Sequence, residues 1–355
     1  MKKNYFMLAA TAALFAACAE TDLVNEINVT ESVKQEAISF ESFTNKTTRA
    51  EIVDETALQT AEGFKVWGYK TSQNNYTVFN GVNVYWVAQN GDVAAHWGYS
   101  DTQYWDETAT YNFYAVAPYD YKSSISNGLI SITDVASGIS TNSKDYLIDR
   151  AGNTGVAGSD KQTQNFDFNH IMAKLSFVLK AGVAEGITVT DLKISGWNNN
   201  VGSFIQSLTE TPTNNTLTEW SQTAGTEGTF TLVGDGTSDE TLTLTADMAA
   251  VNVTDKYIMV PQTITYVPYA AEVKNNSGET ITEEVLESGL TFTISYTIGQ
   301  EVFTNQVGIV PSNQTWGTDT HTTYTITVGP KAIEFGVSSV AGFTNNTQTG
   351  SADIQ

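Results

Sequence analysis

Residues 290–298 read Leu-Thr-Phe-Thr-Ile-Ser-Tyr-Thr-Ile, so large apolar side chains alternate with Thr or Ser along the stretch. A period of two places the apolar side chains on one face of a β-strand and the hydroxyl side chains on the other. Gly299-Gln300 then gives a turn signal, and an apolar pattern resumes at Val302. The stretch predicts a half-buried antiparallel strand that ends in a hairpin.

Similar patterns recur outward from this strand in both directions. Residues 171–180 and 322–328 alternate in the same way, and residues 111–118 form a more continuously apolar strand. Asn90-Gly91 and Asn127-Gly128 are strong hairpin signals. Short strands separated by turns favour an all-β fold of antiparallel β-sandwiches.

Long helices are not indicated, and residues 52–60 and 244–251 are the best short candidates. A chain of 355 residues favours two domains over one. The longest Gly-rich polar stretch ends at residue 165. We therefore expect an N-terminal β-sandwich over residues 50–165 and a C-terminal one over residues 166–355.

The N-terminus carries an export signal. Lys2 and Lys3 precede a run at residues 6–17 that is apolar except for one Thr, and Cys18 follows directly. This is the pattern of a secretory signal peptide over residues 1–17, and the run is too short to span a bilayer. The cysteine at the cut resembles a bacterial lipoprotein box, which predicts lipidation of Cys18; a free thiol is the alternative.

Composition excludes several classes of protein. The net charge of −22 argues against nucleic acid as a partner, because phosphates need Lys and Arg. Cys18 is the only cysteine, so no disulfide can stabilise the fold. A content of 41% hydrophobic residues suffices for packed cores.

No catalytic constellation is recognisable, so we expect no enzyme, no catalytic residue and no cofactor. His96, His170 and His321 lie far apart in the sequence and show no metal-ligand spacing, so no metal site is expected. The acidic segment 235–240 departs from the spacing of a calcium loop and is interpreted as a hairpin tip.

Aromatic residues allow two interpretations. Trp86, Trp97 and Trp105 lie close together in sequence. Large aromatic residues in strands usually fill cores, whereas exposed ones can stack on sugars. The core interpretation is favoured, and a sugar-binding surface stays open as the alternative.

The chain contains two arginines, Arg49 and Arg150. Arg49 lies in a polar segment, residues 44–51, that follows an apolar alternation at Ile38 and Phe40. The alternation predicts a short strand. Arg49 is either a solvated linker residue or a site where a protease cuts.

Several segments together resemble the fimbrillin family, the subunits of type V pili in Gram-negative anaerobes. In chain order they are Ile-Ser-Phe (38–40), Thr-Arg-Ala (48–50), Tyr-Asn-Phe-Tyr-Ala-Val-Ala-Pro (111–118), Asp-Tyr-Leu-Ile (145–148), Phe-Asn-His-Ile-Met-Ala-Lys-Leu-Ser-Phe (168–177), Ile-Met-Val-Pro-Gln (258–262), Tyr-Thr-Ile-Thr-Val (324–328) and Ile-Glu-Phe (333–335).

The resemblance implies two tandem transthyretin-like antiparallel β-sandwiches with Greek-key topology and few short helices. It also implies export as a lipoprotein to the outer membrane and the cell surface or fimbrium. An arginine-specific protease would cut between Arg49 and Ala50, and residues 18–49, a tether with the first strand, would then leave.

Loss of that strand would expose a groove that a neighbour's strand could fill, in a homo- or hetero-polymer of pilus subunits. The best donor candidates are Ile333, Phe335 and Val337, which alternate near the C-terminus; a home strand in the second domain is the alternative. An uncut chain would instead be a pilus tip, an anchor, or an adhesin for a host glycan or protein receptor.

Overall fold

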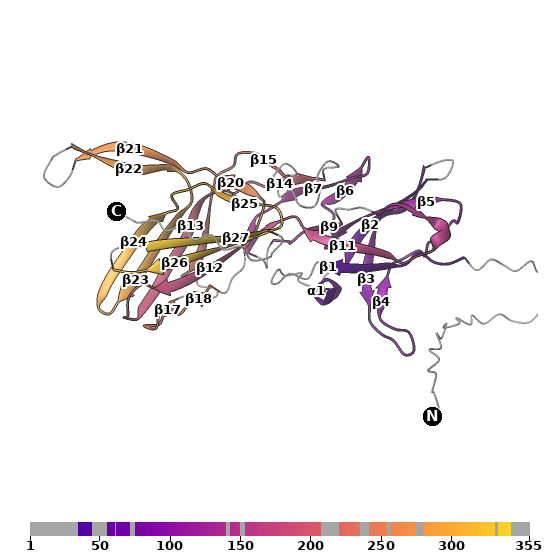
Figure 1. Ribbon diagram of the computed structural model, residues 1–355, viewed down its shortest axis with the longest axis horizontal. Helices are drawn as coiled ribbons and strands as arrows, with labels where there is room; N and C mark the ends of the chain where they lie inside the picture. Colours follow the sequence, from indigo (N-terminus) through magenta and orange to yellow (C-terminus); the bar gives the residue numbers. More distant parts are fainter. Residues whose placement is uncertain are drawn as a thin grey trace, which may run out of the picture. The chain divides into compact units, whose positions relative to one another are not determined.

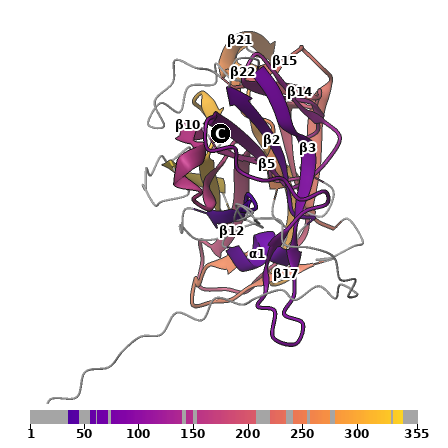
Figure 2. The same ribbon diagram turned by 90° about the vertical axis from the view of Figure 1, so that its right-hand side faces the viewer.

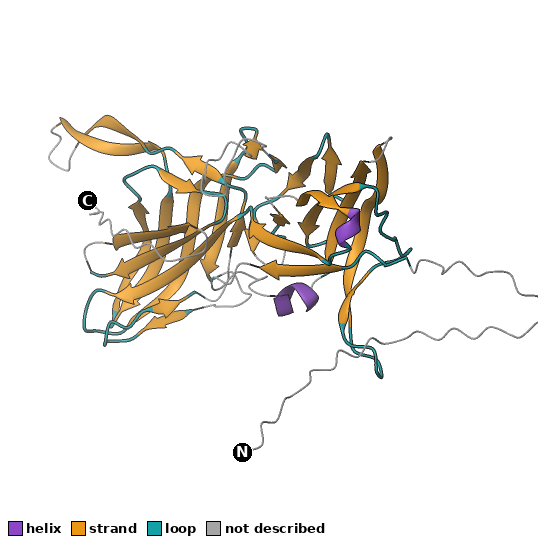
Figure 3. Cartoon of the chain, turned by 45° about the vertical axis from the view of Figure 1, so that its right-hand side comes forward, coloured by secondary structure: helices purple, strands orange, loops and turns teal. Residues whose placement is uncertain are grey.

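The regular secondary structure of the described residues is almost entirely β-strand, with one short α-helix and one turn of 3-10 helix (Figure 3). The computed structural model describes residues 35–44, 55–60, 62–71, 75–139, 143–149, 153–206, 220–234, 241–253, 257–274, 280–330 and 333–341. The predicted all-β sandwich class is confirmed.

The first half of the chain forms an eight-stranded sheet in the order β1-β11-β9-β5-β2-β3-β4, with β10 also paired to β5. Figure 2 shows β2, β3 and β5 side by side in this sheet. The strands are β1 (Phe40–Thr44), β2 (Phe64–Thr71), β3 (Asn75–Val87), β4 (His96–Gly98), β5 (Thr110–Ala117), β9 (Leu147–Asp149), β10 (Asn153–Ala157) and β11 (Gln164–His170).

Both faces of this sheet are covered, which explains the nearly continuous apolar sequence of β5. Phe113 and Ala115 lie in an aromatic cluster on one face. Val116 lies in a different cluster with Ile132 and Phe204. We call the cluster that contains Phe113 the first core.

Strands from both halves of the chain share one small sheet, β15-β14-β7-β6. In addition, β8 of the first half pairs with β19 of the second. The strands are β6 (Ser123–Ser126), β7 (Leu129–Val135), β8 (Gly138–Ile139), β14 (Gly202–Ile205), β15 (Trp220–Gln222) and β19 (Tyr257–Met259).

The second half contributes the sheets β27-β26-β12-β19-β8 and β16-β13-β23-β24, with β18 paired to β12 and β17 to β13. Figure 1 shows β12, β26 and β27 side by side. The strands are β12 (Ala173–Ala181), β13 (Ile187–Asn198), β16 (Glu227–Val233), β17 (Leu242–Leu244), β18 (Val251–Asn252), β23 (Thr291–Ile298), β24 (Glu301–Ile309), β26 (Thr320–Val328) and β27 (Ile333–Ala341).

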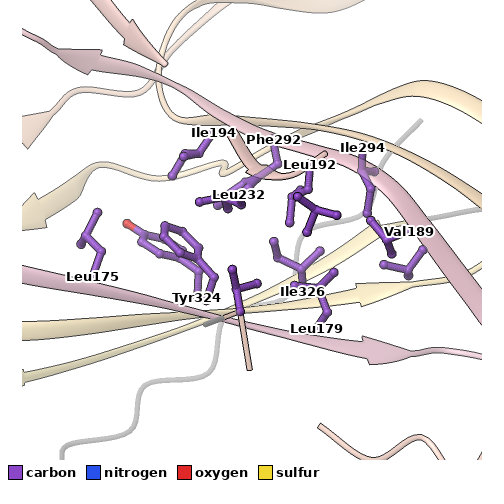
Figure 4. Close-up of a cluster of buried hydrophobic side chains, with 14 of the residues drawn as sticks. Leu175, Leu179, Val189, Leu192, Ile194, Leu232, Phe292, Ile294, Tyr324 and Ile326 are labelled. Atoms are coloured by element: carbon purple, nitrogen blue, oxygen red, sulfur yellow. The ribbon is translucent and has the colours of Figure 1, made fainter. Parts of the chain in front are cut away.

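The alternating side chains of these sheets meet in one apolar core (Figure 4). In β23 the predicted apolar face is buried and the Thr and Ser face is half-buried. Leu175 from β12, Tyr324 from β26 and Ile294 from β23 are each fully buried. The sequence pattern of residues 290–298 therefore predicted the buried face correctly.

Two short antiparallel pairs and two short helical segments complete the described structure. The strands are β20 (Gln262–Ile264) with β25 (Gln314–Trp316), and β21 (Val267–Lys274) with β22 (Thr280–Ser288). The helical segments are α1 (Glu55–Thr60) and the 3-10 turn Gly158–Asp160.

The predicted turns are confirmed, and one predicted helix is wrong. Asn127 and Gly128 both have positive φ, of 51° and 75°, in the β6–β7 hairpin. The helix predicted over residues 244–251 is absent, because residues 245–250 form a turn that connects β17 to β18. The Asp247 carboxylate accepts a hydrogen bond from the backbone N–H of Ala249, and Met248 has a φ of 56°, which stops a helix.

The expected domain division at residues 165 and 166 falls inside β11. The strands on either side of the Gly-rich stretch, β5 and β11, belong to the same sheet. Phe166 and Phe168 pack in the first core. The division into two domains at this position stays a prediction.

Candidate functional site

The short strand predicted around Ile38 and Phe40 lies in a seat that is bounded by backbone on two sides. On one side β1 pairs parallel with β11, from Phe40 opposite Gln164 to Thr44 opposite Phe168. On the other side the residues just before β1 bond to the loop 99–105 that follows β4. The Ile38 N–H donates to the Gln103 carbonyl at 2.8 Å, and the Trp105 N–H donates to the Glu36 carbonyl at 3.0 Å.

Side chains of this segment alternate between solvent and core, as the sequence predicted. Ile38 and Phe40 are 1% and 3% exposed, whereas Ser39 and Glu41 are exposed. We call the place that these two buried side chains and the strand occupy the β1 seat.

The Phe40 ring is enclosed by four other aromatic rings. Centroid distances are 5.2 Å to Phe79, 5.6 Å to Tyr99, 5.8 Å to Phe113 and 5.7 Å to Phe166. The contacts with Phe79, Tyr99 and Phe113 are edge-to-face, a favourable arrangement for aromatic pairs. These rings come from β3, β5, β11 and the loop after β4, so one side chain of β1 contacts much of the first core.

A hydrogen bond from Tyr99 fixes the backbone of the same segment. The Tyr99 hydroxyl donates to the Ile38 carbonyl at 2.6 Å. Burial raises the pKa of the Tyr99 hydroxyl, so the group stays protonated and available as a donor at neutral pH. This bond recognises backbone, so it does not depend on which residue stands at position 38.

Ser42 is an energetically unfavourable residue in the β1 seat. It is 1% exposed, and its hydroxyl has no hydrogen-bond partner among the described residues. A buried hydroxyl without a partner costs free energy compared with an apolar group of similar size. The occupant of the seat is therefore not optimal at this position.

The candidate donor residues Ile333, Phe335 and Val337 lie in β27, which pairs antiparallel with β26 at the edge of its sheet. Their partners in register are Val328, Ile326 and Tyr324, all fully buried. The structure thus holds this segment as a home strand. Its transfer to a neighbour stays a prediction.

The predicted lipidation site Cys18 and the predicted cleavage site Arg49–Ala50 lie outside the described residues. The described chain ends at Thr44 after β1 and resumes at Glu55 in α1. Both predictions stay open.

The tryptophans follow the core interpretation. Trp97 and Trp105 are 5% and 4% exposed in the first core, and Trp86 is partly buried against it. None of the three presents the fully exposed ring that sugar stacking requires.

Titratable residues are not gathered into a recognisable catalytic or metal centre in the described part of the chain. No group of three or more His, Cys, Asp or Glu residues there could hold a metal ion. His170 contacts Asp145 at 3.0 Å, and the His321 ring is 2.8 Å from the Ser176 hydroxyl. In the same described residues, no helix has the length and apolar character needed to cross a membrane.

The strand around Ile38 and Phe40 could be predicted from the sequence, but most of the residues that contact it in the β1 seat could not. Tyr99 and the backbone of residues 103–105 had no signal, because an ordinary turn sequence does not show which strand it contacts. Phe79, Phe113 and Phe166 could be predicted as core residues, but not as neighbours of Phe40.

Comparison with known proteins gives one family and several similar solved structures. A family model described as Fimbrillin-like matches residues 48–342. No curated protein gives a significant match. Similar solved structures include candidate cell adhesion proteins from three Bacteroides species. They come from Bacteroides uniformis (16% identity, TM-score 0.48, covering 88% of this chain and 100% of that one), Bacteroides ovatus (14%, 0.43, 85% and 96%) and Bacteroides fragilis (11%, 0.34, 89% and 97%).

Proposed function

Because the chain belongs to the fimbrillin-like family, we propose that it is a structural pilus subunit that is cut after Arg49 and polymerised by donor-strand exchange. Family membership makes it a fimbrial protein of the cell surface. Export as an outer-membrane lipoprotein through Cys18, and cutting by an arginine-specific protease, belong to the proposal.

The β1 seat is the observation that carries this proposal. β1 pairs with β11 on one side, and residues 36 and 38 just before it make two more backbone bonds to the loop after β4. Departure of the segment leaves these N–H and C=O groups unpaired. Departure of Phe40 also uncovers the four rings around it. The resulting groove offers both backbone pairing and an apolar pocket, which are the two elements of recognition by strand addition.

Such a groove favours growth of a fibre. A subunit that donates one segment and accepts another at a different place makes a heterologous contact, and such contacts form open assemblies unless the rotation closes a ring. Cys18 would then tether the chain only until cleavage, because it leaves together with β1.

The direct test is to incubate the exported chain, residues 18–355, with an arginine-specific protease and to follow its size by light scattering and electron microscopy. We expect cleavage at Arg49 and growth of polymers. Arg49→Lys should stay intact and monomeric, whereas the matched control Arg150→Lys should be cut at Arg49 and assemble. Complete cleavage at Arg49 with persistent monomers would sink the proposal.

A second candidate function, adhesion by an intact subunit, is favoured by one surface feature. Tyr121 is 92% exposed and lines a pocket of about 360 Å³ with Asp120, Ser143, Lys144 and Tyr146. The Tyr146 hydroxyl donates to the Asp120 carboxylate, and both residues line this pocket. An exposed ring beside charged and hydroxyl groups suits a host glycan or a protein receptor.

A glycan array separates this second function from the first. Binding that is lost in Tyr121→Ala and retained in Tyr76→Ala, which changes an exposed tyrosine outside this pocket, would support adhesion. Absence of binding in the unchanged protein, or equal binding by both variants, would exclude the Tyr121 pocket as a glycan site.

A further inference from the structure

The sheet β16-β13-β23-β24 buries one side in the core of the second half and turns Thr and Ser residues outward on the other. Paired residues of neighbouring strands point to the same side, so the outward residues stand in rows across the sheet. The outward positions include Ser195 from β13, Thr229 and Thr231 from β16, and Thr291, Thr293 and Thr297 from β23. We call the outward side, from the row of Thr188 and Thr297 to the row of Ser195 and Thr291, the hydroxyl face.

The hydroxyl face carries no net charge, although the chain is strongly acidic. Its charged residues are Lys193 and Asp191, and their side chains form an ion pair with each other at 3.0 Å. The whole chain has 39 Asp and Glu residues against 17 Lys and Arg residues. Two copies of the chain therefore repel each other in most orientations, and an uncharged face is where they can approach.

We propose that the hydroxyl face binds the same face of a second copy of this chain. The contact goes beyond donor-strand exchange, because it needs neither cleavage nor an empty groove. Both copies present the same lattice, with strands about 4.8 Å apart and small side chains of similar size. Side chains of one copy then fit between the rows of the other, and a surface that fits itself forms a two-fold contact.

The hydroxyl groups are already partly satisfied within the sheet, which makes the face less costly to dry. The Ser195 and Thr229 hydroxyls lie 2.9 Å apart and bond to each other. The Thr190 hydroxyl donates to the Ser295 carbonyl at 3.2 Å. Groups that keep these bonds lose less when a second copy displaces water from the face.

Two exposed valines border the hydroxyl face. Val302 and Val307 of β24 are 69% and 49% exposed, and they lie opposite Thr297 and Thr293 in the register. Because paired residues share a side of the sheet, both valines point outward with the Thr residues. A face-to-face contact removes their apolar surface from water, which favours association.

The free edge of β24 is less suited to pairing than the face. The register between β23 and β24 shifts at Asn305, which has a φ of 49°. The Asn305 N–H donates to the Ser295 hydroxyl at 3.1 Å. A bulge of this kind bends an edge strand and hinders the addition of another strand. The second copy is therefore expected on the face and not at the edge.

The size of the face indicates a weak contact. Four strands about 4.8 Å apart and eight residues of about 3.3 Å each span roughly 400 Å², which is about half of what one partner buries in a stable interface. Two free copies should thus associate weakly, whereas many copies in line should join fibres side by side. Only this last consequence rests on the proposed function.

Sedimentation equilibrium of the uncut chain, residues 18–355 with Cys18→Ser, tests the contact at high protein concentration. We expect self-association that Thr293→Glu weakens by about tenfold or more, because the contact would bury a carboxylate without a partner. Thr325→Glu is the matched control. Thr325 is a half-buried outward residue of β26, in the other sheet, and the substitution gives the same net charge. This control should associate like the unchanged chain.

Thr293→Val is the second variant, and it decides the matter if thermal unfolding shows that Thr293→Glu does not fold. It keeps the shape and the strand preference of the residue and replaces a hydroxyl by a methyl group. Because it adds apolar area at the centre of the contact, self-association should become several-fold stronger. Association that Thr293→Val leaves unchanged or weakens would contradict the inference.

The remaining outcomes separate this inference from the proposed function. A chain that stays monomeric at every concentration, or equal weakening by Thr325→Glu, would overturn the inference and leave donor-strand exchange untouched. Cleaved Thr293→Glu should still polymerise, and electron microscopy should show its fibres apart where unchanged fibres lie side by side. Fibres of Thr293→Glu that lie side by side as often would overturn the inference. Failure of the unchanged chain to polymerise after cleavage would count against the proposed function alone.

Discussion

At the residue scale, Phe40 and Tyr99 hold the N-terminal strand in place by different means. Phe40 supplies apolar burial and ring contacts. Tyr99 donates a hydrogen bond to a backbone carbonyl, and this bond does not depend on the side chain at that position. An occupant of the β1 seat must therefore bring apolar side chains at the positions of Ile38 and Phe40, while the Tyr99 hydrogen bond needs only its backbone. A replacing strand therefore has to meet few side-chain requirements.

Phe40→Ala should lower the free energy of unfolding of the uncut chain by about 3–5 kcal/mol, because it removes a fully packed ring from a core. Glu41→Ala, at the neighbouring exposed position, should change it by less than about 0.5 kcal/mol. Urea denaturation measures both. Equal effects of the two substitutions would mean that the Phe40 ring is not packed as described.

Ser42→Ala should leave stability unchanged or raise it by about 1 kcal/mol, since it removes a buried hydroxyl that lacks a partner. The same substitution should slow assembly after cleavage, because it makes the resident strand fit better. A clear loss of stability, seen in the same denaturation assay, would show that the hydroxyl is satisfied.

At the element scale, the sheets of the second half depend on a bulge in β13. Gly196 has a φ of 97° at a shift of register between β13 and β16. A Cβ atom there would lie 1.9 Å from the Gly289 carbonyl oxygen, a contact that only a backbone shift could relieve. Glycine is therefore required both for conformation and for space.

Gly196→Ala should destabilise the chain by about 2–3 kcal/mol or more, through strain and displaced backbone. Gly186→Ala is the matched control, because a Cβ there meets only the Leu244 carbonyl oxygen at 3.8 Å. Thermal unfolding of the two variants measures the difference. Similar melting temperatures would rule out the predicted clash.

Strands with a clear period of two could be predicted from sequence, because burial of one face dictates that period. β23 and β26 follow their patterns residue by residue. The helix expected at residues 244–251 was wrong because a local Asp247 turn overrides a weak helical pattern. For the β1 seat, only the strand that fills it could be predicted from the sequence. Its contacts could not, since the Tyr99 hydrogen bond, for example, joins residues that are 61 apart in sequence.

At the scale of the whole molecule, the acidic composition shapes assembly. The full chain has a net charge of −22, and the cut subunit stays strongly acidic, so subunits repel one another before they pair. The contacts of the β1 seat are apolar and backbone contacts, which salt hardly weakens. Charge should therefore affect the rate of encounter more than the strength of the final contact.

Assembly of the cleaved chain should accelerate several-fold when salt rises from about 20 mM to about 200 mM, because the Debye length shortens and repulsion falls. Light scattering after a complete cleavage step measures this rate, with cleavage itself followed separately on gels. Slower assembly at high salt would point to attractive charge contacts between subunits.

The central claim is that β1 leaves and another strand takes its place. The N-terminal sequence of subunits in fibres isolated from the cell surface tests it most directly. The account predicts Ala50 as the first residue, with residues 18–49 missing. Subunits in the fibres that still begin at Cys18 would contradict it.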